Sequence, residues 1–342
     1  MARGILKIVF TAEDLARVRI APRADLTWEM VGSLHRLQAH DGGPIITEWR
    51  HQARRQLIDA GLLTQVRTTL IPLAPRARYF PDFLTPIEAQ GGPDQAIQAL
   101  AHTPRARVRD ELELLRTHVH LPATLDDLAR GNPEAIRRLS RAASDYCRAV
   151  LTPHWVFVER ALARERAVVL RGLTDGGVEQ VLSTLSPHMR WRFPVLEVDY
   201  PAGSREIQLG GRGLTLIPSY FCRGTPISLA DPALSPVLVY PAPHRSGLAV
   251  TSTDALAALL GRTRADVLRC VAMTPGCSTT ELAGRAGVPL ATASEHARVL
   301  RQANLIDSVR QANLVLHYPT ELGQDILSDR RSVGPDATLE RV

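Results

Sequence analysis

Residues 278–289 read Ser278-Thr279-Thr280-Glu281-Leu282-Ala283-Gly284-Arg285-Ala286-Gly287-Val288-Pro289, and Leu290 to Leu305 follow. Ser278 and Glu281 have the capping-box spacing that begins a helix. Gly287 predicts a left-handed end to that helix, and Pro289 suits the first turn of a second one, where its missing N–H is no loss. Two helices joined by a tight glycine turn are typical of a helix-turn-helix, whose second helix fits the major groove of DNA.

Apolar residues recur at helical spacing in both helices, which predicts one buried face on each. The predicted inward-facing residues are Leu282, Ala283, Ala286, Ala293, Ala297 and Leu300. The same spacing leaves a polar set on or near the outer side of the second helix, namely Thr292, Glu295, Arg298, Arg301 and Gln302.

Two short β-rich runs follow the second helix, at 305–310 and 314–318. Gln311-Ala312-Asn313 separates them, which is a length and composition suited to a hairpin. A hairpin directly after such a helix is a wing, and Arg310 at its tip can reach a phosphate or the minor groove. Further helices are predicted at 253–260, 262–273 and 320–327, so residues 251–330 form a winged helix-turn-helix.

Several short motifs within residues 253–328 are similar to those of the ArsR/SmtB group of bacterial repressors. They are Arg262-Thr263-Arg264, the Glu281-Leu282-Ala283 helix, the spacing Ser294-x-His296-x-x-x-Leu300 and the exit Ala303-Asn304-Leu305. The resemblance implies a homodimer built through the first and last helices of the winged domain, on palindromic operator DNA. The expected DNA-binding set is Thr292, Ser294, Glu295, His296, Arg298, Arg301, Arg310, Gln311 and Asn313.

Three features depart from the family pattern. Glu295 stands where the family usually has a basic or neutral residue, and an acid near phosphates weakens binding unless it accepts from a cytosine amine. Pro289 and Leu290 replace the usual Ser-Gln type start. Asn304 replaces the usual glycine, which is a mild change because asparagine tolerates the left-handed conformation.

The cysteine pattern argues against thiolate metal sensing. The family's metal-sensing members carry a Cys-x-Cys pair on the third helix, where this chain has only Cys277 just before Ser278. Cys270 lies on the apolar side of the preceding helix, and both residues are interpreted as small buried hydrophobes. We therefore expect no thiolate metal site and no cofactor, while a site with oxygen and nitrogen ligands elsewhere stays open.

The composition indicates a cytoplasmic protein of two or three domains. A chain of 342 residues is long for one domain. Four cysteines without framework spacing fit a reducing compartment. We find neither a signal peptide nor a run of membrane-spanning length, so we expect no membrane partner.

The formal net charge of +6 does not come from the predicted winged domain. Residues 251–330 hold eight Arg and eight Asp or Glu, a net of zero, whereas 103–171 hold thirteen Arg and nine acids, a net of +4. A neutral winged domain predicts modest non-specific affinity and a shallow salt dependence. The arginine runs at 137–148 and 160–171 are interpreted as solvated helix faces, with an auxiliary phosphate-binding surface as the alternative.

The region before the winged domain divides into two parts. Residues 1–186 begin with a β-strand and continue with helices predicted at 11–18, 28–37, 44–60, 93–102, 104–115, 132–150 and 153–171. Residues 187–250 carry short β-rich runs, which predict a small antiparallel sheet and then a linker. With a tail at 331–342, the fold class is α+β, mainly α. This N-terminal part resembles the long extension carried by some ArsR-like proteins.

No set of residues before the winged domain makes a catalytic site. His118 and His120 have no carboxylate at metal spacing, and Ser219 lacks the flanking glycines of a nucleophile elbow. Glu197 and Asp199 share one strand face, which solvent-facing alternation explains. The aromatic loop 79–86 could line a pocket, although core packing is favoured.

The sequence thus predicts a homodimeric transcriptional regulator, most simply a repressor, whose partner is double-stranded DNA. The region before residue 251 would serve dimerisation or sense a small-molecule effector. We expect no enzyme activity. The alternative is a protein-interaction module whose winged helix docks a partner rather than DNA, which the neutral charge, Glu295 and Leu290 favour.

Overall fold

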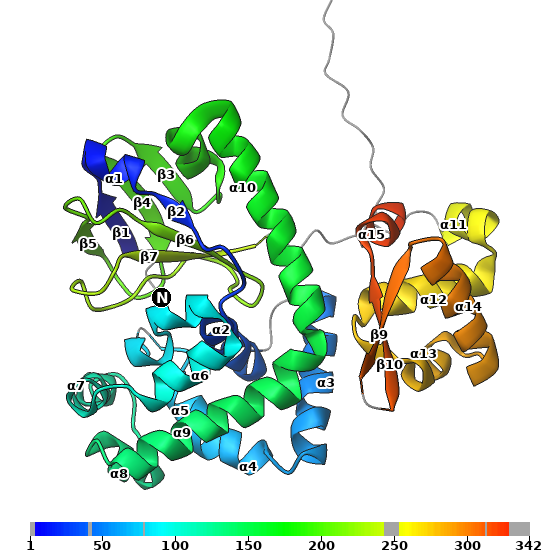
Figure 1. Cartoon of the computed structure of the whole chain (residues 1–342), viewed down its shortest axis with the longest axis horizontal. Coiled ribbons are helices and arrows are strands. Elements are labelled where there is room, and N and C mark those ends of the chain that lie inside the picture. Colours follow the sequence, from blue (N-terminus) through cyan, green and yellow to red (C-terminus); the bar gives the residue numbers. More distant parts are fainter. Residues whose placement is uncertain (1–3, 40–42, 78, 243–252, 312, 328–342) are drawn as a thin grey trace, which may run out of the picture. The chain divides into compact units, whose positions relative to one another are not determined.

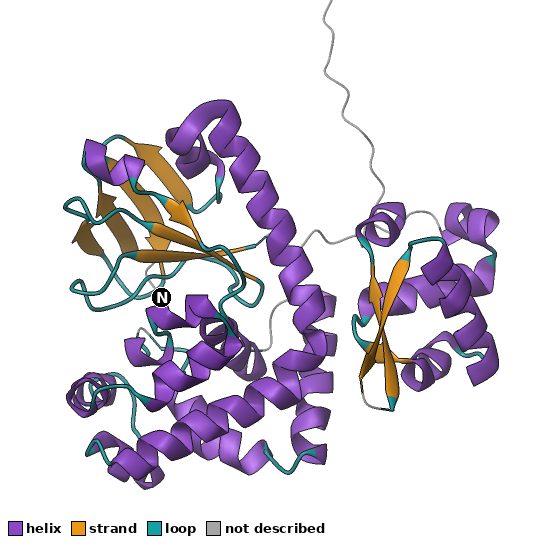
Figure 2. Cartoon of the chain, viewed as in Figure 1, coloured by secondary structure: helices purple, strands orange, loops and turns teal. Residues whose placement is uncertain are grey.

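The computed structural model describes residues 4–39, 43–77, 79–242, 253–311 and 313–327. The chain forms two compact units, Met1–His244 (unit 1) and Arg245–Val342 (unit 2). Helices dominate both units and small sheets accompany them (Figures 1 and 2), which confirms the α+β, mainly α class. The predicted tail at 331–342 and most of the predicted linker lie outside the described residues.

Unit 1 contains a four-stranded mixed sheet that joins the start of the chain to residues 189–208. Its strands are β1 (Gly4–Val9), β3 (Met189–Arg192), β4 (Val195–Tyr200) and β5 (Arg205–Gln208), in the order β3-β4-β1-β5. Strand β1 pairs antiparallel with β4 and parallel with β5. Its side chains alternate, with Leu6 and Ile8 buried and Ile5 and Lys7 exposed, as expected of a strand with one covered face.

A second sheet of unit 1 is parallel throughout. It contains β2 (Arg19–Ile20), β6 (Thr215–Ser219) and β7 (Val237–Pro241), in the order β2-β6-β7. The expected small antiparallel sheet confined to 187–250 therefore needs correction. Strands β1 and β2 pair with partners about 190 residues away, so the expected boundary at 186/187 falls inside one unit.

Helices fill the remainder of unit 1. The longer ones are α2 (Leu26–Gln38), α3 (Gly43–Asp59), α6 (Pro93–Ala101), α7 (Arg105–Arg116), α9 (Pro133–Tyr146) and α10 (Trp155–Thr184). Shorter helical segments are α1 (Ala12–Ala16), α4 (Leu63–Gln65), η1 (Val66–Leu70), α5 (Ile71–Leu73), η2 (Asp82–Leu84), η3 (Ile87–Gly91), η4 (Ala123–Leu125), α8 (Asp126–Ala129), η5 (Cys147–Leu151) and η6 (Thr152–His154). Each predicted helix is present, but α10 continues well past Arg171 and bends at Gly177, whose φ is 71°. The run at 63–73 was not predicted.

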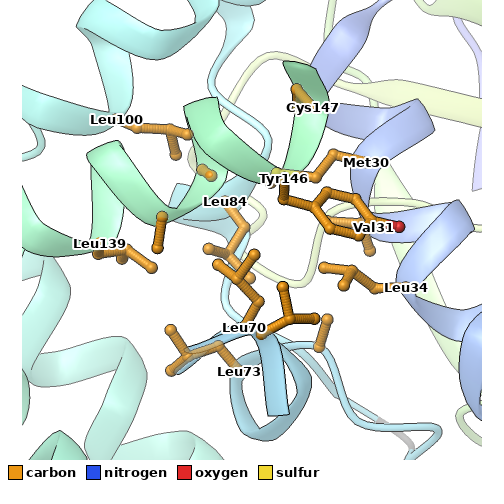
Figure 3. Close-up of a cluster of buried hydrophobic side chains, with 14 of the residues drawn as sticks. Met30, Val31, Leu34, Leu70, Leu73, Leu84, Leu100, Leu139, Tyr146 and Cys147 are labelled. Atoms are coloured by element: carbon orange, nitrogen blue, oxygen red, sulfur yellow. The ribbon is translucent and has the colours of Figure 1, made fainter. Parts of the chain in front are cut away.

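The helices of unit 1 enclose an apolar core centred on α9 and α2 (Figure 3). Tyr146 is fully buried in it, among leucines that include Leu34 and Leu70. Its hydroxyl lies 2.8 Å from the hydroxyl of Ser33, so the one polar atom of this large ring is satisfied. A separate core lies between the mixed sheet and α10, where Val169 and Leu182 cover the buried strand face.

Unit 2 has the winged helix-turn-helix order. Its elements are α11 (Thr253–Leu260), α12 (Arg262–Met273), β8 (Cys277–Ser278), α13 (Thr279–Ala286), α14 (Leu290–Gln302), β9 (Ile306–Gln311), β10 (Leu314–Pro319) and α15 (Glu321–Leu327). The predicted helices and wing are all present. The sequence did not indicate β8, which pairs with β10 and makes the wing a three-stranded sheet, β8-β10-β9.

Candidate nucleic-acid interface

The turn between α13 and α14 forms as its residue types require. The Ser278 hydroxyl accepts from the amide of Glu281 at 3.2 Å, and a carboxylate oxygen of Glu281 accepts from the amide of Ser278 at 2.9 Å. Gly287 ends α13 in the left-handed region, with φ at 64°. Pro289 is the N-cap of α14 and provides no side-chain cap, so the second helix begins without the hydrogen bond that a serine would make.

One face of α14 is buried and the other is polar, as predicted. Ala293, Ala297 and Leu300 are buried, and Ala297 and Leu300 share a core with Leu282 and Leu268. Helix α14 packs against α12, α13 and β9. Ser294, Glu295, Arg298, Arg301 and Gln302 are exposed, and Thr292 is partly exposed. The structure therefore brings the predicted polar residues together on one side of α14.

Arg298 and Glu295 bind each other on this exposed side. The guanidinium donates from Nε at 2.9 Å and from Nη2 at 2.6 Å to the two carboxylate oxygens, and from Nη1 at 3.1 Å to Gln302 Oε1. The hydrogen bonds from Arg298 lower the pKa of Glu295, so this carboxyl stays ionised at neutral pH. Glu295, on the same helix, therefore balances the charge of Arg298.

His296 is less available than its position in the sequence suggested. The residue is only partly exposed, and its Nδ1 is buried without a hydrogen-bond partner among the described residues. One edge of the ring thus faces protein rather than solvent. This placement favours a role for His296 in packing over a role in reading a base.

The wing carries the other predicted contact residues. Arg310 and Gln311 are exposed at the end of β9, and Asn313 is exposed in the turn, while residue 312 lies outside the described residues. Arg310 lies opposite Val315 in the hairpin. Leu314 and Val315 are also exposed, at 54% and 37%, so the wing tip presents apolar and cationic groups together.

A buried histidine in the wing was not predicted. His317 on β10 hydrogen-bonds through Nε2 to the hydroxyl of Thr279 at 3.0 Å and through Nδ1 to that of Ser308 at 2.9 Å. Burial, followed by the charge of Arg301, lowers the pKa of His317 to about 4, so the ring is neutral at physiological pH. The ring joins α13 to both wing strands. The hairpin register, which places His317 opposite Ser308, could have suggested this pair.

The cysteines of unit 2 do not resemble a metal site. Cys277 is fully buried, and burial raises the pKa of its thiol to about 12, which disfavours the thiolate that metals bind. No group of three His, Cys, Asp or Glu suited to a metal ion occurs in the ranges that the structure describes.

The candidate catalytic residues of unit 1 have structural partners. Asp199 accepts from Arg190 at 3.0 Å and lies 3.2 Å from His188, and these hydrogen bonds lower the pKa of Asp199. The Ser219 hydroxyl accepts from the amide of Cys222 at 3.0 Å, which holds a turn. Within the described residues, no helix has the length and apolar character needed to cross a membrane.

The comparisons with known proteins agree on the helix-turn-helix. A family model described as a helix-turn-helix domain matches residues 259–309. A stretch of 64 residues is 34% identical to an uncharacterized HTH-type transcriptional regulator of Methanocaldococcus jannaschii. That stretch covers 19% of this chain and 16% of the relative, so the chain spans only a small part of the relative's length. No solved structure matches the chain.

Proposed function

We propose that this protein is a cytoplasmic, sequence-specific DNA-binding transcriptional regulator, and most simply a repressor of the ArsR/SmtB type. The observation that carries the proposal is the exposed polar face of α14. This helix follows the capped helix α13 and the left-handed turn at Gly287, and the wing comes after it. The similarity to a helix-turn-helix family and to an HTH-type transcriptional regulator supports it. In this proposal α14 enters the major groove and Arg310 contacts a phosphate or the minor groove.

A homodimer on a palindromic operator is part of the proposal. Leu259 on α11 is 72% exposed and Leu322 on α15 is 47% exposed, and both helices pack against α12. Two large apolar side chains on the first and last helices of unit 2 are suited to a surface covered by a second copy. A two-fold dimer would place two α14 helices on half-sites about one DNA turn apart.

Selection of DNA sequences from a random library by the full chain would test the proposal without knowledge of the operator. We expect enrichment of an inverted repeat and, by fluorescence anisotropy, affinity for it that scrambled competitor does not remove. Arg298→Ala should weaken binding to the enriched sequence, while the control Arg137→Ala, an exposed arginine on α9, should keep it. Failure to enrich any sequence would contradict the proposal.

A second candidate function is a protein-interaction module. Leu290 at the start of α14 is 53% exposed, Glu295 follows five residues later on the same helix, and residues 251–330 carry no net positive charge. Such a face suits a protein partner better than a polyanion. If selection yields no DNA and Leu290→Glu abolishes binding to a partner, this second function would replace the first.

A further inference from the structure

Unit 1 contains a cavity of about 260 Å³ that neither the helix-turn-helix nor the wing uses. It is bounded by α2, by residues 76, 77, 79, 80 and 82, by residues 200–202 at the end of β4, and by the connection between β6 and β7. The cavity is larger than the engineered cavity of about 150 Å³ that is known to hold benzene, so one substituted ring would fit. All of its walls belong to unit 1, which has its own apolar cores.

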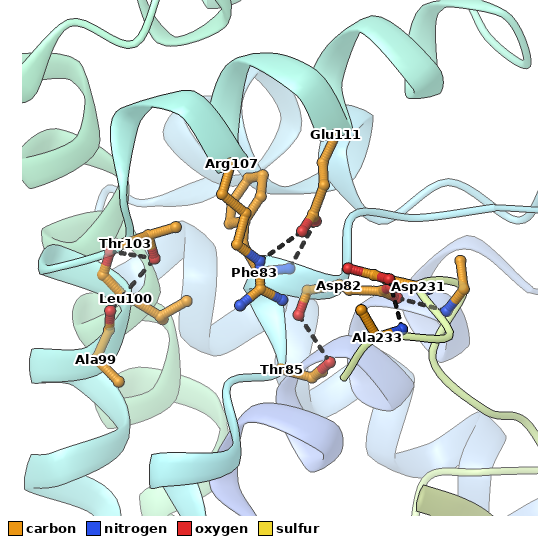
Figure 4. Close-up of polar contacts among 11 residues, drawn as sticks. Asp82, Phe83, Thr85, Ala99, Leu100, Thr103, Arg107, Glu111, Asp231 and Ala233 are labelled. Carbon is orange, nitrogen blue, oxygen red and sulfur yellow. Dashed lines mark hydrogen bonds and ion pairs between the residues drawn. The ribbon is translucent and has the colours of Figure 1, made fainter. Parts of the chain in front are cut away.

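Buried carboxylates hold the wall that the β6–β7 connection forms. Glu29 on α2 accepts from the amides of Tyr220 at 2.8 Å and Phe221 at 3.0 Å. At the other end, Asp82 accepts from the amides of Ala230 at 2.9 Å and Asp231 at 2.7 Å, and the Asp82–Asp231 contact is drawn in Figure 4. The wall is thus fixed at both ends, which lowers the entropy lost when a ligand is bound.

A glycine allows α2 to reach this wall. A Cβ at Gly32 would lie 2.9 Å from the Cβ of Phe221, closer than side chains tolerate. The interior beside it is aromatic and apolar, because Trp28 and Val239 line the cavity and are buried. Phe80 meets Trp28 edge to face, with ring centroids 6.0 Å apart. Such a lining favours the flat apolar body of an aromatic ligand.

The charged residues around the cavity favour an anion. Arg36, Arg76 and Arg223 line it, and Asp82 is the one acid among its described lining residues. Asp82 is already engaged with two backbone amides. Three guanidinium groups and one carboxylate give this lining more positive than negative groups, and the planar, five-donor fork of an arginine matches a carboxylate.

A ring nitrogen of His35 provides the third recognition group. His35 hydrogen-bonds to the carbonyl of Pro75, and its Nε2 is buried with no partner among the described residues. Burial, followed by Arg36 and Arg76, lowers the pKa of His35 to about 4, so the ring is neutral. Because the carbonyl can only accept, the other nitrogen carries the proton and Nε2 is left as an acceptor. A buried acceptor of this kind requires a donor, and a ligand hydroxyl or N–H group is one.

We propose that this cavity binds a small aromatic carboxylate that also carries a hydroxyl or N–H group. The carboxylate pairs with the arginines, the ring lies against Trp28 and Phe80, and the donor reaches His35 Nε2. All residues of this binding site belong to unit 1, so the site does not depend on the proposed function of unit 2. Its role as the site of an effector that controls DNA binding rests on the proposed function.

Titration of the full chain with 4-hydroxybenzoate tests the site in the absence of DNA. Calorimetry and tryptophan fluorescence are both suitable, since Trp28 lines the cavity and all four tryptophans lie in unit 1. We expect saturable binding, a roughly 2- to 10-fold loss for benzoate, which lacks the donor, and a loss of about 10- to 100-fold for uncharged 4-hydroxybenzyl alcohol.

Two variants and a matched control locate the binding. Arg223→Gln should weaken 4-hydroxybenzoate and benzoate alike, whereas His35→Phe should weaken only 4-hydroxybenzoate. Arg137→Gln removes an exposed arginine of α9 and should leave both affinities unchanged. Unchanged circular dichroism and thermal midpoints establish that the variants are folded.

Three results would overturn the proposal. They are no saturable binding of 4-hydroxybenzoate or other hydroxylated aromatic carboxylates at millimolar concentration, equal affinity for the uncharged alcohol, and full affinity in Arg223→Gln. Addition of the bound ligand to a DNA-binding assay separates the two proposals. A ligand that binds without changing DNA affinity keeps the site and rejects the effector role, while a chain that binds ligand but no DNA contradicts only the proposed function.

Discussion

Arg298 and Glu295 form a two-point ion pair on the exposed face of α14, with N–O distances of 2.6 and 2.9 Å. An exposed pair of this kind contributes little to folding stability. It does fix the direction of the guanidinium, and it cancels the charge that a phosphate would attract. Any contact of Arg298 with DNA must therefore either replace Glu295 or use the N–H groups that the pair leaves available.

Arg298→Ala should lower the affinity for the selected operator by roughly 10- to 100-fold if the guanidinium contacts a guanine edge. In that event specificity should relax at one base pair per half-site. If Arg298 contacts phosphate, all sequences should lose affinity alike and the salt dependence should become shallower. Anisotropy titrations with the operator and with single-base variants, at two salt concentrations, distinguish these results.

Glu295→Gln should tighten binding to non-specific DNA. The change removes the negative charge that balances Arg298 and that repels phosphate. Titration with scrambled duplex at low salt measures the effect, and Glu134→Gln, at a glutamate paired with Arg137 on α9, is the matched control. If Glu295→Gln binds as the unmodified protein does, the Glu295 side chain points away from DNA.

Two glycines of the same motif should respond to alanine in opposite directions. Gly284 lies within α13 with open space around its Cβ position, so Gly284→Ala should stabilise unit 2 by about 0.5–1 kcal/mol. Gly287 has φ of 64°, so Gly287→Ala should destabilise it by about 1 kcal/mol. Scanning calorimetry of the full chain reports both, and a loss of stability in Gly284→Ala would show that its surface is covered.

The stability of unit 2 should fall as the solution is acidified from about pH 6.5 to about pH 4. The folded-state pKa of His317 is depressed to about 4, so between these values the unfolded chain binds a proton that the folded chain does not. Above pH 6.5 the contribution of neutral His317 to the free energy of unfolding is fully present. On the order of 2 kcal/mol of it is lost when the pH falls to 4. His317→Gln should flatten this part of the pH profile, and identical profiles for the two proteins would contradict the assignment.

Leu259→Glu should convert a homodimer to a monomer and weaken operator binding. The leucine is 72% exposed on α11, and a carboxylate there would resist burial against a second copy. Sedimentation velocity at several protein concentrations measures the association. Leu114→Glu, on an exposed apolar position of α7 in unit 1, is the control. A dimer that persists in Leu259→Glu would place the interface elsewhere.

Unit 2 could be predicted from the sequence because its determinants are local. The capping residues Ser278 and Glu281, the turn at Gly287 and the period of Ala293, Ala297 and Leu300 lie within a few turns of one another. Strand β8 escaped prediction because two residues are too short for a period. The contact of His317 with Ser308 follows from the hairpin register, but its contact with Thr279 joins residues 38 positions apart and no local pattern indicates it.

Unit 1 was predicted less well because its sheets depend on distant pairs. The alternation of apolar and polar residues in β1 identifies a strand. It does not identify the strands that pair with β1, which follow about 190 residues later. The cavity combines α2, residues 76, 77, 79, 80 and 82, and the β6–β7 connection, and no motif links these segments. The aromatic stretch 79–86 was assigned to core packing. Tyr79 and Phe83 do lie in the core and Phe80 packs against it, but Tyr79 and Phe80 also line the cavity.

The long-range pairing of β1 also sets an order of events during synthesis. Strand β1 is synthesised before its partners and cannot complete its hydrogen bonds until residues 195–208 have emerged, and β2 likewise pairs only with the later residues 215–216. The helices that lie between these strands in the sequence depend on contacts of shorter range, so they can form before the sheets are complete. The first strand is therefore exposed for most of the translation of unit 1, and a chaperone that shields nascent edges would act on residues 4–9.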